Sequence, residues 1–325
     1  MSTRSALVRV VRSGLAESEH RVHVAVCDAD GRLLAWAGDP SRRVFARSSM
    51  KPVQAAVSLS SMDDRADARH VAIMCASHNG EAVHVRAMRR VLRLGSLDPS
   101  ALRNPPGWPL DAASMAGARR PSRERHNCSG KHAGMAVASL QAGWDVEGYR
   151  RRRHPLQRRV LRAVVAGTGH EDPVIGVDGC GVPVHGVPLA AMATLYARLA
   201  RPERFGELAA SVEAAVAAMR AHPYLVAGRN RIDTALMEAV DGVTSKVGAE
   251  ALACATWLDP GLGFAVKVED GGERAAGPVL IATLARLGAV PRAAVRALDR
   301  FAAPWVTGGG ERVGALEVVL DLERP

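Results

Sequence analysis

The chain has 325 residues, and 48% of them are apolar, which is enough for one large domain or two closely packed ones. Aromatic residues make up only 4%, which argues against nucleic-acid platforms that stack bases and against aromatic sugar-binding clefts. The net charge of +10 favours a small anionic or zwitterionic partner and no nucleic acid, because we expect the densest basic run, Arg150–Arg153, to be a solvated helix face.

The first elements predicted along the chain are strands followed by a helix. Residues 21–27 alternate apolar and polar side chains, Asp28-Ala-Asp-Gly31 supplies a turn, and residues 32–36 return, so 21–37 is predicted as a β-hairpin. A helix is predicted over 48–60, and Val71–Met74 is an apolar, strand-like stretch. Between about 70 and 240 the chain is predicted to be mainly helical. Helical periodicity is found over 85–94, 156–166, 189–199 and 205–220.

After Gly248 the pattern returns to strands. Residues 251–257 and 263–268 flank Asp259-Pro-Gly261 and predict a second hairpin. Two helices, at about 276–287 and 293–301, and a last strand, 314–320, follow. This order predicts an α+β fold with an antiparallel sheet built from both chain ends, flanked by helices and carrying an inserted helical lobe. We expect one domain over 1–325, with a sheet lobe at about 1–47 and 242–325, a helical lobe at about 48–241, and a cleft between them.

The compartment is predicted from cysteines and apolar runs. The five cysteines are widely spaced and odd in number, which argues against a disulfide framework. Residues 1–20 contain no apolar core of a signal peptide, and the longest uncharged stretch, 179–197, is interrupted by prolines. We therefore expect a cytoplasmic protein with no membrane partner.

The most informative motif is a serine followed three residues later by a lysine, Ser48 and Lys51. Residues three apart share a face of a helix, so a neutral Lys51 amine could take the proton of the Ser48 hydroxyl. Pro52 is tolerated in a first helical turn, which places Ser48 near the helix N-terminus, where the helix dipole favours an anion. A serine cap followed by a surface lysine explains the same spacing.

Other polar runs can be interpreted either as ordinary turns and surface residues or as parts of a functional site. Cys75–Glu81 contains turn-forming residues, and Lys246 is compatible with a surface lysine at the start of a strand. The segments His126–Gly134 and Asp178–Pro183 gather Cys128, His126, His132 and Cys180 around glycines. They allow either a metal site or buried free thiols, because two lone cysteines are a weak zinc signal.

Taken together, five motifs closely resemble the Rhizobium-type (class 3) L-asparaginases, also called asparaginase II. The motifs are Arg47-Ser-Ser-Met-Lys-Pro52, Ala76-Ser-His-Asn-Gly-Glu81, His126-Asn-Cys-Ser-Gly-Lys-His-Ala-Gly-Met135, Gly176-Val-Asp-Gly-Cys-Gly-Val-Pro183 and Ser245-Lys-Val-Gly-Ala-Glu250. The resemblance runs from about residue 8 to the C-terminus. It implies a fold similar to serine β-lactamases, penicillin-binding proteins and serine-dependent glutaminases.

The resemblance also implies roles for individual residues. Ser48 and Lys51 match a first Ser-Lys tandem, with Ser48 as nucleophile and Lys51 as its base, and Ser77 and Lys246 match a second tandem. The remaining matches form a zinc site and a substrate site. Cys128, Lys131 and Cys180 match the ligands of one zinc ion per chain, and Asp178, Arg47, His78 and Asn79 are expected substrate-binding residues.

Two departures separate the chain from the lactamases. The third lactamase motif is normally Lys-Thr/Ser-Gly, and here Lys246-Val-Gly248 lacks the hydroxyl; Ser77-His-Asn79 also differs from Ser-Asp-Asn. We therefore expect a homodimeric amidohydrolase that converts L-asparagine to L-aspartate and ammonia. The alternatives are another Ser-x-x-Lys hydrolase, such as a glutaminase or a small-substrate amidase or esterase, and a non-catalytic zinc- or ligand-binding module.

Overall fold

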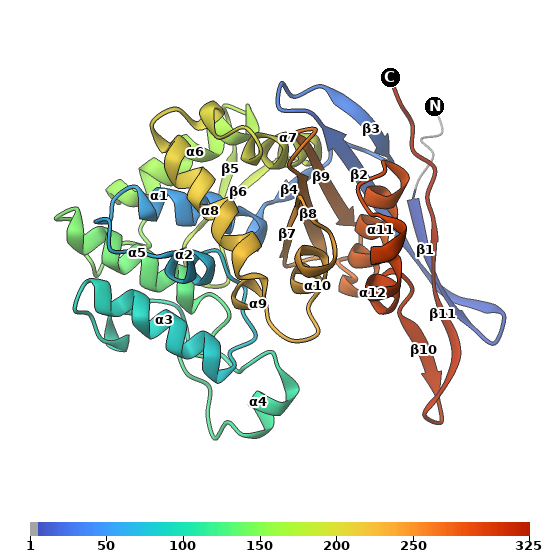
Figure 1. The fold of residues 1–325 in the computed structure, drawn as a ribbon, viewed down its shortest axis with the longest axis horizontal. Helices are drawn as coiled ribbons and strands as arrows, with labels where there is room; N and C mark the ends of the chain where they lie inside the picture. The colour runs from blue at the N-terminus through green and yellow to red at the C-terminus, as the bar shows by residue number, and fades with distance from the viewer. Residues whose placement is uncertain (1–5) are drawn as a thin grey trace.

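The main sheet has antiparallel strands contributed by both ends of the chain, as the computed structural model of residues 6–325 shows (Figure 1). Its order is β10-β11-β1-β2-β9-β8-β7, and β3 pairs with β2. The strands are β1 (Ala6–Arg12), β2 (Leu15–Cys27), β3 (Leu33–Ala37), β7 (Val243–Gly248), β8 (Leu252–Trp257), β9 (Leu262–Val268), β10 (Trp305–Gly308) and β11 (Glu311–Val319). The contact between the two ends is the β2–β9 pair, in which Val24 lies opposite Val266.

The long central segment supplies most helices and a small second sheet. The helices are α1 (Lys51–Leu59), α2 (Ala68–Met74), α3 (Ala82–Leu94), α4 (Ala112–Ala116), α5 (Ser129–Gln141), α6 (Pro155–Thr168), α7 (Leu189–Leu199), α8 (Ala209–Ala221), α9 (Pro223–Val226), α10 (Ile232–Ala239), α11 (Glu273–Arg286) and α12 (Arg292–Ala302). Three short 3-10 helices are η1 (Arg47–Met50), η2 (Pro99–Ala101) and η3 (Pro202–Leu208). The small sheet has the order β4-β6-β5, from β4 (Arg43–Phe45), β5 (Val174–Val177) and β6 (Pro183–Pro188).

The main sheet is covered on both faces, because its side chains alternate between two hydrophobic cores. On β2, Val24 and Val26 lie in the core formed with α11 and α12, whereas Ala25 and Cys27 lie in the core formed with the central helices. Helix α7 packs directly on β9, where a Cβ on Gly263 would overlap the Ala193 carbonyl oxygen. In Figure 1 α11 and α12 lie together on one side of the strands, apart from α1 to α8.

The α+β architecture with an antiparallel sheet from both chain ends is confirmed. Both hairpins and the helices near 48–60, 85–94, 156–166, 189–199, 276–287 and 293–301 are present, with ends shifted by a few residues. The helix expected over 205–220 is divided between η3 and α8. The strand-like reading of Val71–Met74 is wrong: these residues form α2, which Asp67 caps by accepting hydrogen bonds from the backbone N–H groups of Arg69 and His70.

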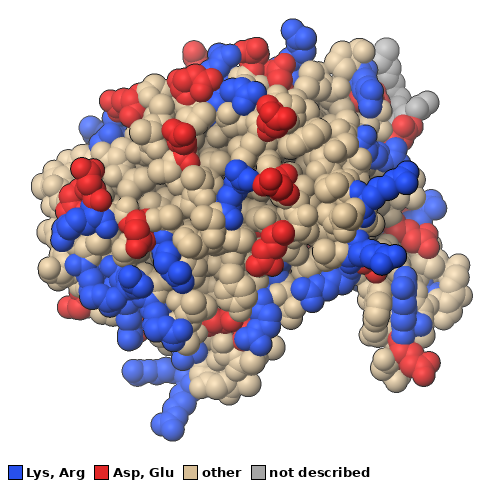
Figure 2. Space-filling model, viewed as in Figure 1, with Lys and Arg blue, Asp and Glu red and all other residues tan. Residues whose placement is uncertain are grey.

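The outer surface carries the charges. On the face drawn in Figure 2, acidic and basic residues are interspersed, and Lys and Arg gather at one end of the molecule. Between residues 6 and 325 there is no helix with the length and apolar content needed to span a bilayer.

Candidate active site

Ser48 lies in the 3-10 turn that leads into α1. Arg47, just before it, adopts a left-handed backbone conformation with φ of 45°, and Pro52 occupies the first turn of α1, as expected. The two neighbouring serines have different surroundings. Ser48 lines the main cavity, whereas Ser49 is fully buried and donates its hydroxyl to the Lys246 carbonyl oxygen at 2.9 Å.

Lys51 joins three of the motifs. Its side chain is fully buried, and Nζ donates to the Ala76 carbonyl oxygen at 2.6 Å, to Ser77 Oγ at 2.8 Å and, at 3.5 Å, to the Asn127 carbonyl oxygen. Within the described residues the Ser48 hydroxyl has no hydrogen bond, an open arrangement that catalytic groups often show before substrate binds.

The electrostatic surroundings of Lys51 favour its neutral form. Burial lowers the pKa of Lys51; the Cys128 thiolate opposes that shift, and the positive charge of Lys131 adds to it. Lys51 and the buried Lys246 carry like charges as well. Their repulsion appears in the pKa of Lys246, which burial above all, and Lys51 in addition, bring down to about 8.

Lys246 is paired with an acid that the sequence motifs do not contain. Its Nζ lies 3.3 Å from Asp233 Oδ2, and both side chains are fully buried. Asp233, in the first turn of α10, also accepts hydrogen bonds from Ser245 Oγ at 2.8 Å and from the Val247 N–H at 3.0 Å. Buried ions need such pairing, so a buried lysine predicts an acidic partner, but it does not say which acid that is.

The cavity next to Ser48 has a volume of about 650 Å³. Ser48, Ser77 and Asn127 belong to its wall, and the charged residues in the wall are Arg231, Glu273 and Arg274. Much of the remaining wall is apolar and comes from β7, β8, α11 and α12. The cavity therefore lies between the main sheet and the central segment, where the sequence predicts a cleft.

Cys128, Lys131 and Cys180 lie together beside Lys51. Cys128 precedes α5 and Lys131 lies in its first turn, while Cys180 lies in the turn between β5 and β6. Lys131 Nζ contacts Cys180 Sγ at 3.0 Å, and all three side chains are buried. Burial lowers the pKa of Lys131, but the negative charge shared by the Cys180 and Cys128 sulfurs outweighs that effect and raises it above its ordinary value.

The donor set fits a zinc ion that takes sulfur and nitrogen ligands. Within residues 6–325 no three His, Cys, Asp or Glu side chains are grouped to hold a metal, so a site here requires the amine of Lys131 as a donor beside the two sulfurs. His132 offers a further nitrogen: Nδ1 bonds the Tyr149 hydroxyl at 2.8 Å, and Nε2 is buried with no partner among the described residues. Zinc would require neutral Lys131 and thiolate forms of Cys128 and Cys180.

Arg47 and Asp178 form an ion pair at the edge of this cluster. Arg47 Nε donates to Asp178 Oδ1 at 2.7 Å. Burial raises the pKa of Asp178, but Lys131 and Arg47 reverse this effect and keep its pKa below the ordinary value. Asp178 is therefore an anion beside Cys180, whose Sγ lies 3.5 Å from Asp178 Oδ2.

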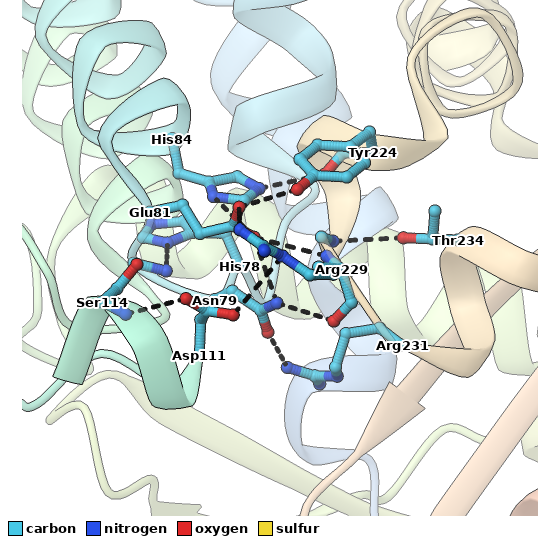
Figure 3. Close-up of polar contacts among 12 residues, drawn as sticks. His78, Asn79, Glu81, His84, Asp111, Ser114, Tyr224, Arg229, Arg231 and Thr234 are labelled. Atoms are coloured by element: carbon cyan, nitrogen blue, oxygen red, sulfur yellow. Dashed lines mark hydrogen bonds and ion pairs between the residues drawn. The ribbon is translucent and has the colours of Figure 1, made fainter. Parts of the chain in front are cut away.

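His78 and Asn79 are buried, with their polar atoms already engaged (Figure 3). His78 Nδ1 accepts from the Gly80 N–H, so Nε2 carries the proton that faces Ser129 Oγ at 2.9 Å. Asn79 Nδ2 donates to the Arg229 carbonyl oxygen at 2.9 Å, and Asn79 Oδ1 accepts from Arg231 at 3.1 Å. Neither residue lines the cavity, so their placement gives no support to the expected direct contact with substrate.

The same network contains residues that the motif reading did not select. Glu81 accepts from Tyr224 Oη at 2.7 Å and pairs with Arg229 at 3.4 Å, and Arg229 also lies 3.7 Å from Asp111. Figure 3 shows these side chains joining the Asn79–Glu81 turn to the loop before α10. The partners are separated by about 150 positions in the chain, so sequence spacing gives no signal for them.

Residues 8–318 match the sequence model of the L-asparaginase II family. No curated protein matches the chain.

Three solved structures show distant similarity to the chain, each with a TM-score of 0.39. One is a probable glutaminase from Bacillus subtilis complexed with 6-diazo-5-oxo-L-norleucine, 12% identical over 87% of this chain and 90% of that chain. A β-lactamase from Mycobacterium bovis is 13% identical over 82% of this chain and 94% of that chain. A SurE structure with D-Leu is 16% identical over 89% of this chain and 74% of that chain.

Proposed function

The chain belongs to the L-asparaginase II family and is an amidohydrolase, and we propose that it converts L-asparagine to L-aspartate and ammonia. One observation supports this proposal more than any other. Ser48 and Ser77 face one cavity, while the buried Lys51 amine contacts Ser77 Oγ at 2.8 Å from behind. A hydroxyl nucleophile, a second hydroxyl and a desolvated amine are the parts that acyl transfer from an amide needs.

In the proposed reaction Ser48 Oγ attacks the side-chain amide carbon of asparagine, and Lys51 accepts the Ser48 proton. Ser77, already hydrogen-bonded to Lys51, relays that proton to the leaving ammonia. Water then hydrolyses the acyl-enzyme and releases L-aspartate. Lys246, held by Asp233, acts as the neighbouring cation that disfavours a proton on Lys51.

The proposed zinc ligands are Cys128, Lys131 and Cys180, and Asp178 with Arg47 binds the polar groups of the substrate beside them. Zinc, when bound, supplies a Lewis acid that attracts a substrate oxygen. The residues of this chain would do the rest: the two thiolates and the neutral amine hold the ion, and Asp178 offers its carboxylate to an ammonium group. The expectations of a homodimer and of a cytoplasmic location stay predictions.

Ammonia release tests the proposal. Purified protein should release ammonia from L-asparagine, and Ser48→Ala should lose nearly all turnover while its melting temperature stays unchanged, because the Ser48 hydroxyl makes no described contact. Ser49→Ala is the matched control, since Ser49 turns away from the cavity. L-glutamine is assayed in parallel, because one methylene changes binding by only about 1–3 kcal/mol. Wild-type turnover in Ser48→Ala would exclude Ser48 as nucleophile.

A further inference from the structure

Arg231 is a cavity-lining guanidinium without an anionic partner among residues 6–325. It lies directly before α10, and its neighbours Asn230 and Ile232 line the same cavity as Ser48 and Ser77. Across residues 6–325 no carboxylate lies within ion-pair distance of Arg231, in contrast to Arg229 two positions earlier. Its one side-chain hydrogen bond joins Nη1 to Asn79 Oδ1 at 3.1 Å, as Figure 3 shows.

The loop that carries Arg231 is held in a fixed conformation. Gly228 has φ of 113°, and a Cβ at that position would lie 2.7 Å from Glu81 Oε1 and 2.8 Å from Asn79 Nδ2. The Gly228 N–H donates to Thr234 Oγ1 at 3.1 Å, and Asn79 Nδ2 donates to the Arg229 carbonyl oxygen. The neutral Asn79 oxygen thus orients one side of the Arg231 guanidinium without neutralising its charge.

The other charges of the cavity wall do not perform the same task. Arg274 also lines the cavity, but its guanidinium is already bound, with Nε to His20 Nε2 at 2.9 Å and Nη2 to Ser18 Oγ at 3.1 Å. Glu273 is an anion. Arg231 is also close enough to the reaction centre for its charge, after burial and the Lys51 charge, to contribute to the lowered pKa of Lys246.

We propose that Arg231 binds the α-carboxylate of the substrate and that Asn79 positions Arg231 for this contact. The inference rests on the proposed function, since it identifies which group of an amino-acid amide this wall of the cavity binds. An arginine has five N–H donors in a planar fork that matches a carboxylate, and Asn79 occupies only one Nη. A zwitterion whose amide lies at Ser48 brings its carboxylate into a cavity that holds this unpaired guanidinium. Asn79 then acts through Arg231, which explains how a buried amide contributes to substrate binding.

The test compares two substrates in wild type, Arg231→Gln and Arg231→Lys. L-asparagine carries the α-carboxylate, and 3-aminopropanamide is the same amide with that carboxylate replaced by hydrogen. In Arg231→Gln we expect kcat/KM for L-asparagine to fall roughly 10- to 100-fold, the loss typical of a hydrogen bond to a charged group, with kcat/KM for 3-aminopropanamide nearly unchanged. Arg231→Lys should retain part of the preference, because it keeps the charge and loses the fork.

Arg274→Gln is the matched control, because it removes the same group from the same cavity wall at a position where the guanidinium is already bound. It should leave the ratio of the two kcat/KM values unchanged. Equal losses on both substrates in Arg231→Gln would indicate a structural role, and no loss on either would show that Arg231 does not contact the substrate. Either result would overturn the proposal.

A binding measurement separates this inference from the proposed function. Succinamate keeps the carboxylate and lacks the α-amino group, and calorimetry with wild type and Arg231→Gln needs no turnover. Binding to wild type that weakens by roughly 10-fold or more in the variant supports the contact even if wild type releases no ammonia from L-asparagine. Equal binding to both proteins, or binding to neither, overturns it, whereas failure of L-asparagine hydrolysis alone overturns only the proposed function.

Discussion

Replacing Asp233 by asparagine removes one charge from the fully buried pair with Lys246 while nearly preserving its shape. The asparagine oxygen can still accept from Ser245 Oγ, which now donates to Asp233 at 2.8 Å. The change therefore acts mainly on the charge balance around Lys246, whose Nζ lies 3.3 Å from the carboxylate. If the Lys246 cation disfavours a proton on Lys51, then activity should respond to this distant substitution through its pH dependence.

The size of the effect follows from the pKa of Lys246. Burial lowers this pKa from 10.5 to about 8, and Asp233 works against that shift. A nearby opposite charge changes a pKa by about 1–3 units, so Asp233→Asn should lower the pKa of Lys246 by about that amount. Near pH 7.5 Lys246 is then mostly protonated in wild type and mostly neutral in the variant. If the Lys246 cation keeps Lys51 neutral, its loss in Asp233→Asn lets the pKa of Lys51 rise, so the acid-side limb of kcat/KM should move to higher pH than in wild type.

Folding stability gives a second readout with a definite sign. The unfolded chain holds the Lys246 proton up to about 10.5, and the folded chain releases it near 8, so stability rises with pH across this window. The contribution is complete above the unfolded pKa and is lost as pH falls through about 8. The shift of 2.5 units corresponds to about 3 kcal/mol. In Asp233→Asn the rise should start at lower pH.

The assay is ammonia release from L-asparagine between roughly pH 5.5 and 9.5, together with denaturant unfolding over the alkaline range. Asp241→Asn is the control, because that carboxylate is almost fully exposed and pairs with Arg220 at the surface. Lys246→Met should remove the part of the alkaline rise in stability that Lys246 contributes. If Asp233→Asn shows the wild-type pH profile at reduced amplitude, the assignment of Lys246 as the charge that controls Lys51 is wrong.

Two further predictions concern the metal and the loop before α10. Protein purified without chelator should contain about one zinc per chain, Cys128→Ala should lose it, and stripping should raise KM more than it lowers kcat; full affinity without metal would show that the site does not serve substrate binding. Gly228→Ala should lower the free energy of unfolding by about 1–3 kcal/mol or more, measured by denaturant titration, because alanine is strained at φ of 113° and its Cβ would crowd Glu81. Gly143→Ala, with positive φ but open space around it, isolates the backbone part of that cost.

Elements with local signals could be predicted from the sequence. The hairpins β2–β3 and β8–β9 follow from alternating side chains and short turns, and the amphipathic α3 follows from its periodicity. Helix α2 could not be read in this way, because Val71, Ala72, Ile73 and Met74 are all buried and leave no polar face to reveal the helical period. Strand β1 pairs on both edges, with β11 and with β2, a relation across the whole chain that no local pattern contains.

The residues of the candidate site also divide into those with a local sequence signal and those without one. Ser48, Lys51, Ser77 and Lys246 stand in recognisable motifs, and the structure brings the first three around one cavity and its rear wall. Asp233 and Arg231 carry no motif. The role of Asp233 follows from its ion pair with Lys246. The proposed role of Arg231 follows from the lack of an acidic partner for it among the described residues. Such roles depend on which side chains meet in space, because the same two residue types form an ordinary surface ion pair at Arg220 and Asp241.

The distribution of lysine and arginine adds a signal that the motifs alone do not express. The chain has 43 basic residues, and only four are lysine: Lys51, Lys131, Lys246 and Lys267. Three of these four meet at the site, and each has a different partner there. Among the described residues Lys51 contacts neutral oxygens, Lys131 contacts a sulfur that shares a negative charge with Cys128, and Lys246 contacts a carboxylate.

Lysine can lose its proton when it is buried, whereas arginine stays charged in every protein environment. The positions where a neutral amine has chemical value therefore keep lysine, while the surface charge is supplied by arginine. Because the three partners differ in charge, they hold the three amines at different proton affinities within one buried cluster: lowered at Lys51, about 8 at Lys246 and raised at Lys131. One amine is thus suited to accept a proton and another to carry a charge. The third contacts a cysteine sulfur, and it would have to be neutral to bind the proposed zinc ion.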